Sequence, residues 1–209
     1  DQPRSRGLGD VYKRQTLNDK LREKSPTEII KWGLGTSKNP ILTTNFRPYE
    51  VAILHLCVQT KEDIKVVWCD TGYNTKAIYI YAEKIISELR LNIEVYAPKQ
   101  KFKGEVPGID DPLHELFTEQ VKLEPFRRAM SEIKPDIWIT NLRKGQTSFR
   151  DTIDIVSKTD DGLLKLSPFY NWSDKDLDSY MNKNNLVNEY DYFDPTKVDE
   201  KRECGLHGN

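Results

Sequence analysis

The stretch that decides the fold is "PILTTNFRPYEVAILHLCVQTKEDIKVVWCD", residues 40–70. Both ends of it, residues 40–44 and 65–70, are short apolar runs rich in β-branched residues, which is typical of buried strands. Between them, Pro48 stands at a first helical position and opens a segment that is apolar nearly all round. We interpret this segment as a buried helix, although its periodicity alone leaves a strand open. The stretch therefore predicts a βαβ unit with two parallel strands.

The same alternation continues through the rest of the chain. Residues 71–90 carry apolar side chains at helical spacing, with Thr75 as the expected N-cap. A second helix is expected from Pro125 and a third after the candidate N-cap Ser173. Further strands are expected at residues 92–98, 135–140 and 162–168, with a loop at residues 99–111. The pattern predicts the α/β class: an open, mostly parallel twisted sheet with helices on both faces.

Composition limits the classes of function. The 209 residues suit one domain, and the net charge of −1, from 33 acidic and 32 basic residues, disfavours general nucleic-acid or membrane binding. Three cysteines without a CxxC pair and three histidines favour a reduced, cytoplasmic protein without a metal site. No apolar run is long enough to span a membrane, and the first residues lack the apolar core of a signal peptide.

Three segments follow from these considerations. Residues 1–15 have no regular periodicity, and we interpret them as a non-native or disordered arm. Residues 16–198 are expected to form the α/β domain, and residues 199–209 a C-terminal tail.

Polar loops follow three of the expected strands: "TTNFRP" at residues 43–48, "DTGYNT" at 70–75 and "NLRKGQTSFR" at 141–150. Ligands of open α/β sheets bind beyond the carboxyl ends of the strands, so these loops should meet at one site. Hydroxyl groups, a helix N-terminus and several arginines favour a multiply charged anion. Ordinary loop chemistry remains the alternative for each loop taken alone.

A cysteine near the end, in "RECGLHG" at residues 202–208, has unusual neighbours. Adjacent basic groups lower the pKa of a thiol and so favour the thiolate nucleophile. The alternative is an incidental cysteine in a terminal tail.

Six motifs occur together in one order: Thr43 to Phe46, "DTGYNT", "KLEPFRRAM" from Lys122, "LRKGQTSFR" from Leu142, "SPFYNWSDKDLDSYM" from Ser167, and "RECGLHG". In order and approximate spacing they resemble the phosphoadenylyl-sulfate (PAPS) reductases, from about Leu21 to the end. The resemblance implies an adenine nucleotide α-hydrolase-like, Rossmann-like fold. It also implies reduction of PAPS to sulfite with electrons from thioredoxin or glutaredoxin, and a possible homodimer.

The resemblance also implies the site residues. Cys204 would be the nucleophile, with Arg202 and His207 beside it. Charge cancellation and substrate contacts would come from twelve residues: Thr43, Thr44, Asn45, Phe46, Arg47, Asp70, Gly72, Lys122, Arg143, Lys144, Gln146 and Arg150. Of these, Asp70 and Gly72 would line the nucleoside side. The resemblance thus makes residues 16–198 the nucleotide-binding domain and residues 199–209 a mobile catalytic tail expected to close over bound substrate.

Two departures from the family pattern bear on this interpretation. Iron–sulfur members carry paired cysteines that are missing here, so we expect the cluster-free type. The first loop has Arg47 and Pro48 where the family more often has a glycine after the phenylalanine, which bears on recognition of the 3'-phosphate. Two alternatives therefore stay open: a related enzyme without redox chemistry, and a non-catalytic nucleotide-binding module.

Overall fold

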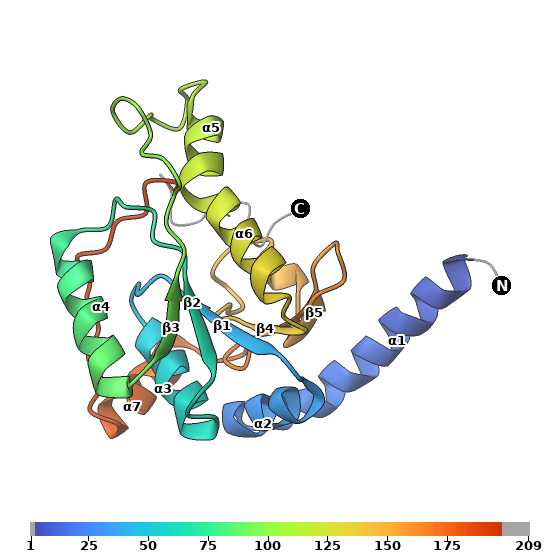
Figure 1. Ribbon diagram of the computed structural model, residues 1–209. Helices are drawn as coiled ribbons and strands as arrows, with labels where there is room; N and C mark the ends of the chain where they lie inside the picture. The colour runs from blue at the N-terminus through green and yellow to red at the C-terminus, as the bar shows by residue number, and fades with distance from the viewer. Residues whose placement is uncertain (1–2, 198–209) are drawn as a thin grey trace.

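The computed structural model describes residues 3–197, with side chains from residue 12 onward. A six-stranded sheet forms its centre, in the order β3-β2-β1-β4-β6-β5 (Figure 1). Its strands are β1 (Pro40–Thr44), β2 (Lys65–Trp68), β3 (Asn92–Val95), β4 (Ile137–Ile139), β5 (Val156–Lys158) and β6 (Leu164–Leu166). All neighbours are parallel except β5 and β6. The expected α/β fold with a mostly parallel sheet is confirmed.

The βαβ unit predicted from residues 40–70 is present. Helix α3 (Glu50–Thr60) connects β1 to β2, and the two strands pair in register from Ile41 opposite Lys65 to Thr44 opposite Trp68. Eight of the eleven residues of α3 are buried, because α2 (Pro26–Thr36), α4 (Lys76–Leu89) and α7 (Asp174–Lys183) pack around it. This burial is why the segment shows no polar stripe in the sequence.

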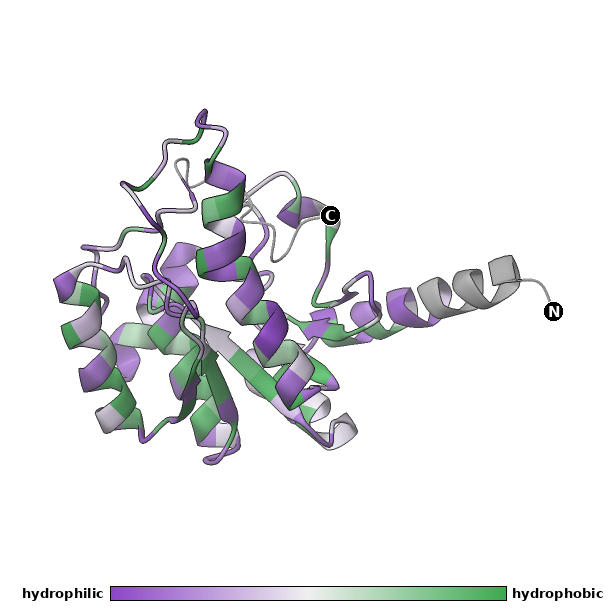
Figure 2. Ribbon diagram, turned by 45° about the horizontal axis from the view of Figure 1, so that its top comes forward, coloured by the Kyte–Doolittle hydropathy of each residue, from purple (hydrophilic) through white to green (hydrophobic). Residues whose placement is uncertain are grey.

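Helices cover both faces of the sheet. Alternate strand residues point to opposite faces, so Leu42 and Val66 join a large core with α2, α3, α4 and α7. Ile41 and Val67 instead join a smaller core with α6 (Glu124–Ile133). Figure 2 shows the strands in the colour of hydrophobic residues between these helices. The two-sided covering explains why the strands read as continuous apolar runs.

Helix α1 (Pro3–Arg22) differs from the expectation that residues 1–15 have no regular structure. Its end is attached to the sheet, because the Asn18 amide donates to the Val156 carbonyl at 2.9 Å and accepts from the Val156 N–H at 2.8 Å. Asn18 thus satisfies the hydrogen-bonding capacity of the Val156 backbone in the edge strand β5. This strand is too short to be predicted from periodicity. Toward residue 3 the helix extends away from the sheet (Figure 1). Whether residues 1–15 are native to the protein stays a prediction.

The helix expected from Pro125 begins earlier. Helix α5 (His114–Thr118) continues through a π-helical turn (Glu119–Leu123) into α6. Pro125 has no N–H and its ring crowds the carbonyl of Val121, so a regular α-helical bond is impossible there. The π turn accommodates the proline without ending the helix.

After α7 the chain crosses the carboxyl end of the sheet without regular structure. The Tyr81 hydroxyl donates to the Val187 carbonyl at 2.7 Å, and the Thr75 hydroxyl donates to the Asp191 carbonyl at 2.5 Å. We call residues 187–197 the crossing segment. The predicted tail, residues 199–209, lies outside the described residues. Among the helices of residues 3–197, none is both long and apolar enough to cross a membrane.

Candidate functional site

Two adjoining pockets lie beyond the carboxyl ends of β1 and β4, at the point where the strand order of the sheet reverses. Strand β1 pairs with β2 on one side and β4 on the other, which is the switch point at which open α/β sheets bind ligands. The inner pocket is lined in part by Thr43, Glu50, Lys122 and Trp138. The outer pocket is lined in part by residues of the loop after β4 and of the crossing segment. Both pockets share the lining residues Asn45, Arg47, Arg150 and Lys197.

The loop after β1 has an unusual backbone. Phe46 and Tyr49 have φ values of 55° and 70°, in the left-handed region that non-glycine residues seldom occupy. The turn is held because the Phe46 N–H donates to the Thr44 hydroxyl at 3.1 Å and the Tyr49 N–H donates to the Asn188 side chain at 2.7 Å. Strain that neighbours stabilise in this way is common at functional sites.

This backbone conformation places the side chains of the four predicted residues Thr43, Thr44, Asn45 and Phe46 in different surroundings. Thr43 lines the inner pocket and accepts a hydrogen bond from the Trp138 indole at 2.8 Å, which directs its own O–H elsewhere. Phe46 is fully buried against Trp68, with ring centroids 5.0 Å apart. The Phe46 side chain therefore anchors the loop in the core and lines neither pocket, and its substrate contact stays a prediction.

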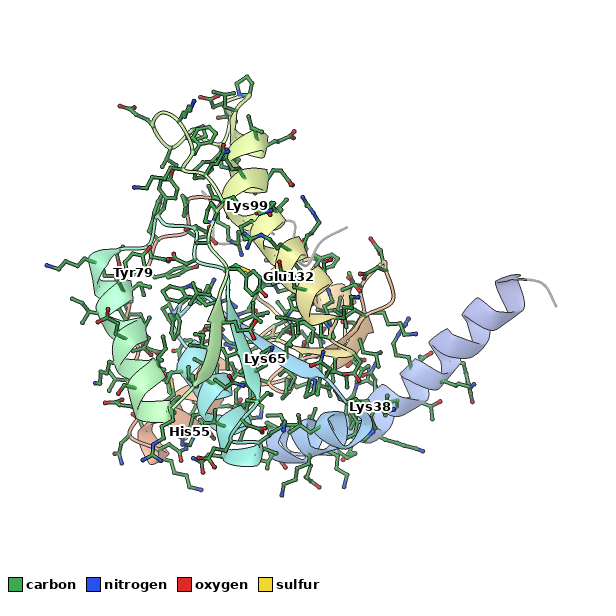
Figure 3. All side chains as sticks on the ribbon, viewed as in Figure 1. Lys38, His55, Lys65, Tyr79, Lys99 and Glu132 are labelled. Carbon is green, nitrogen blue, oxygen red and sulfur yellow. The ribbon has the colours of Figure 1, made fainter. Side chains whose placement is uncertain are left out.

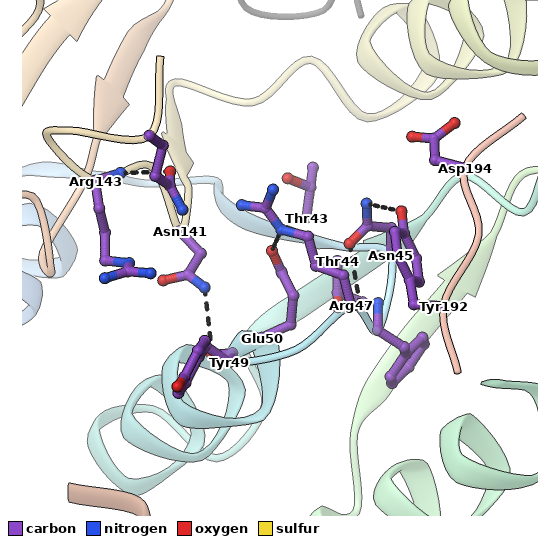
Figure 4. Close-up of polar contacts among 12 residues, drawn as sticks. Thr43, Thr44, Asn45, Arg47, Tyr49, Glu50, Asn141, Arg143, Tyr192 and Asp194 are labelled. Carbon is purple, nitrogen blue, oxygen red and sulfur yellow. Dashed lines mark hydrogen bonds and ion pairs between the residues drawn. The ribbon is translucent and has the colours of Figure 1, made fainter. Parts of the chain in front are cut away.

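Arg47 and Glu50 form an ion pair inside the inner pocket. The Arg47 Nε lies 3.0 Å from the Glu50 Oε1, and the Glu50 side chain is 7% exposed. Figure 4 shows the Arg47 guanidinium above Glu50 and beside Thr43. Arg47 thus has its own counterion three residues later in the chain.

Lys122 comes from the π-helical turn and is buried. Its ammonium group pairs with the Asp194 carboxylate and donates to the Thr196 hydroxyl at 3.1 Å. Burial would raise the pKa of Asp194, but Lys122 and the hydrogen bonds from Thr196 outweigh it and hold this pKa below its usual value. Lys122 therefore ties the crossing segment to the pocket.

In the loop after β4, one side chain organises the basic residues. Gln146 accepts from the Arg143 N–H at 3.0 Å and from Arg150 at 2.5 Å. Arg143 also pairs with Asp174 at 2.6 Å, and Lys144 is exposed at the outer pocket. The structure thus brings these four predicted residues together beside Arg47.

Asp70 and Gly72 lie apart from the pocket linings. The Asp70 carboxylate accepts from the Gly72 N–H at 2.9 Å, from Asn74 at 2.8 Å and from the Tyr79 hydroxyl at 2.9 Å (Tyr79 is labelled in Figure 3). These bonds close the loop after β2 on itself. Neither Asp70 nor Gly72 lines the inner or the outer pocket.

The two cysteines within the described residues have different environments. Cys57 is buried in α3, and burial raises the pKa of its thiol. Cys69 lines the inner pocket, where burial raises its pKa to about 12 despite the opposing charges of Lys122 and Arg128. Both thiols are therefore protonated near neutral pH. Cys204, Arg202 and His207 lie outside the described residues.

Several lining residues were not among the predicted ones. Among them are Glu50, Asn141, Tyr192, Asp194 and Lys197. The acidic and aromatic run "YDYFDPTK" at residues 190–197, placed just before the cysteine motif, is the signal that would have pointed to the last three. Glu50 was hidden because it reads as the first residue of an apolar helix.

The sheet order and the pocket at its switch point define the class of the protein, an α/β protein like the adenine nucleotide α-hydrolases. The fold is similar to that of FMN adenylyltransferase from Candida glabrata, at a TM-score of 0.57 and 11% identity over 79% of this chain and 56% of that one. A model of the phosphoadenosine phosphosulfate reductase domain matches residues 39–190, and the chain belongs to this family.

Two relatives in this family match most of the chain. Phosphoadenosine 5'-phosphosulfate reductase from Xylella fastidiosa (strain M12) is 30% identical, over 93% of this chain and 94% of the relative. The crystal structure of PAPS reductase from Candida auris, a phosphate complex, has a TM-score of 0.72 and 25% identity. That match covers 83% of this chain and 86% of the Candida protein.

Proposed function

We propose that the protein reduces PAPS to sulfite and adenosine 3',5'-bisphosphate. The observation that carries the proposal is the family match over nearly the full chain, together with a basic pocket at the switch point of the sheet. In the first step the Cys204 thiolate attacks the sulfur of the sulfuryl group. The bond from this sulfur to the phosphate oxygen breaks, adenosine 3',5'-bisphosphate leaves, and Cys204 becomes a cysteine S-sulfonate.

In the second step thioredoxin supplies the two electrons. One of its thiolates attacks the Cys204 sulfur and releases sulfite, and the second thiol resolves the mixed disulfide, so that thioredoxin leaves as a disulfide and Cys204 as a thiol. Glutaredoxin has the same chemistry and is the alternative donor. The leaving group is a weakly basic phosphate, so no strong general acid is required.

The pocket residues would serve the first step by binding and cancelling charge. Thr43 would donate its hydroxyl, while Arg47 and Arg150 would face the anionic groups from two sides of the inner pocket. Lys144 at the rim would attract the substrate. Arg202 and His207 would stabilise the Cys204 thiolate.

We further propose that the enzyme contains no iron–sulfur cluster. The sequence holds three cysteines, and a cluster with four thiolate ligands needs four. Cys57 is fully buried in α3, within the core that covers one face of the sheet, whereas Cys69 lies in the inner pocket. The two thiols thus lie in different parts of the fold, which supports the cluster-free type.

Three further features complete the proposal. The enzyme works in the cytoplasm, where thioredoxin keeps thiols reduced. Cys204 serves in turn a substrate in the pocket and a bulky protein donor. The active form is a homodimer.

Intact mass spectrometry of the reduced protein mixed with PAPS tests this function. We expect a mass increase of one sulfonate group that maps to Cys204 and disappears on addition of reduced thioredoxin. Cys204→Ser should bind adenosine 3',5'-bisphosphate without forming the adduct, whereas Cys69→Ser should form it. Protein that binds the nucleotide but never carries the sulfonate would contradict the reductase and favour a nucleotide-binding relative without redox chemistry.

A further inference from the structure

Glu50 is a buried carboxylate in a pocket whose other charges are mostly positive. Its side chain is 7% exposed, and Arg47 Nε contacts its Oε1 at 3.0 Å. Thr44 hydrogen-bonds to the carboxylate, and the charge of Arg150 acts on it from the loop after β4. Glu50, Thr44, Arg47 and Arg150 all line the inner pocket.

Burying the Glu50 carboxylate costs free energy, which its charged and hydrogen-bonding neighbours offset. Burial raises the pKa of Glu50, and Arg47, Arg150 and Thr44 oppose that rise. A negative group also repels a sulfate or phosphate, so Glu50 is unsuited to contact an anionic substrate. Glu50 instead contacts Arg47 and Thr44, whose side chains can donate hydrogen bonds to an anion.

The geometry of Arg47 shows what the carboxylate does. Glu50 occupies the Nε side of the guanidinium, and Figure 4 shows the two terminal nitrogens on the side away from Glu50. Those terminal nitrogens have the forked arrangement that binds a phosphate or sulfate with two parallel hydrogen bonds. Without Glu50, the like charges of Arg47 and Arg150 would repel each other across the pocket.

We propose that Glu50 is a positioning residue, which holds Arg47 and Arg150 toward the inner pocket so that they bind an anionic group of the nucleotide. The inference rests on the proposed function, since the ligand is a sulfonucleotide. Arg47 supplies the fork, and Glu50, three residues later in the chain, fixes its direction.

Equilibrium binding of adenosine 3',5'-bisphosphate, measured by calorimetry, tests the role. We expect Glu50→Gln to weaken binding about tenfold, which corresponds to about 1.4 kcal/mol. Glu50→Asp keeps the charge but withdraws it from Arg47, so we expect a similar loss. Glu88→Gln removes an exposed carboxylate on α4 and should bind as the wild type does. Unchanged or tighter binding by either Glu50 variant would overturn the proposal, because a carboxylate that merely cancels charge repels the anion.

A double-mutant cycle separates positioning from a general loss of stability. If Glu50 acts through Arg47, Glu50→Gln should add little to the loss already caused by Arg47→Met. In the reductase assay KM should rise while kcat changes little. A purely structural role would lower the melting temperature and produce additive losses, and that result would also overturn the proposal.

The two proposals fail in different ways. Wild-type protein that binds the nucleotide without forming the Cys204 adduct contradicts the reductase and leaves the Glu50 test valid. Wild-type protein that does not bind adenosine 3',5'-bisphosphate contradicts both.

Discussion

Asn45 donates a hydrogen bond from its side-chain amide to the Tyr192 hydroxyl at 2.7 Å, joining the loop after β1 to the crossing segment (Figure 4). The two residues are 147 positions apart in the chain. Both line the outer pocket. The wall of the pocket is therefore assembled from distant parts of the sequence, and its shape depends on how firmly the crossing segment is held.

Tyr192→Phe should weaken the contact between the loop after β1 and the crossing segment. The lost bond leaves a partly buried amide without its partner, and we expect about 1 kcal/mol lower stability and nucleotide binding weaker by a few fold. Urea unfolding and calorimetry measure the two effects. Tyr190→Phe is the matched control, because Tyr190 is 69% exposed and its hydroxyl accepts a hydrogen bond from the exposed Asn188 amide at 3.1 Å. Equal effects of the two substitutions would contradict a specific role of the Asn45 contact.

The buried pair of Lys122 and Asp194 should be strongly coupled. Asp194→Asn or Lys122→Met alone leaves a buried charge uncompensated, and each should cost about 3–5 kcal/mol of unfolding free energy. The double variant should lose less than the sum of the two. Chemical denaturation measures all three, and additive losses would show that the two groups do not interact.

The same pair predicts a pH dependence. Because the pKa of Asp194 is lowered in the folded state, its contribution to stability is fully present above the unfolded value of about 3.9. The contribution is lost as the pH falls through the folded pKa. Between about pH 6 and about pH 3, wild type should therefore lose more stability than Asp194→Asn, as measured by urea unfolding. Parallel curves would contradict the assignment.

Two glycines of α2 should respond in opposite ways to the same substitution. A Cβ on Gly33 would meet the Leu166 side chain at 2.4 Å, whereas a Cβ on Gly35 would have nothing within 4 Å. Gly33→Ala should therefore destabilise by about 1–3 kcal/mol through overpacking against β6. Gly35→Ala should stabilise by up to about 1 kcal/mol, since alanine favours a helix. Thermal unfolding of the two variants measures this, and equal shifts would contradict the close packing of α2.

The three thiols should differ in reactivity. Burial raises the pKa of Cys69 to about 12, and that of Cys57 is raised as well, so both are poor nucleophiles near neutral pH. Iodoacetamide should therefore modify Cys204 first in the folded protein, and peptide mapping identifies the site. Bound adenosine 3',5'-bisphosphate should further slow any reaction at Cys69. Modification of Cys69 before Cys204 would contradict the proposed nucleophile.

The sequence predicted those parts of the molecule whose signals are local. The strands β1, β2 and β4, the N-caps Thr75 and Ser173, and the basic loop after β4 all follow from short patterns, and each is present. Asp70 and Gly72 stand at the end of a strand as expected, but their side-chain and backbone bonds close the loop on itself. That outcome depends on Asn74 and Tyr79 and cannot be deduced from strand position.

What the sequence did not predict depends on long-range contacts. Strand β5 is three residues long and is completed by the side chain of Asn18, 138 positions earlier. Asp194 lies at the pocket in a segment without regular structure, which its ion pair with Lys122 holds across the carboxyl end of the sheet. No periodicity marks either contact, since each is a single pairing of side chains across the fold.

The π-helical turn that carries Lys122 makes the site sensitive to the length of one helix. Regular α-helix advances by about 100° per residue, so deleting Glu119 or Gln120 would turn the direction in which the Lys122 side chain leaves the helix by about that angle. Without the π turn, Pro125 would crowd the carbonyl four positions before it, so the shortened helix would also be strained there. The pocket would lose the Lys122 cation without any change of an amino acid that lines it, so this helix fixes the site by the count of its residues as much as by their chemistry.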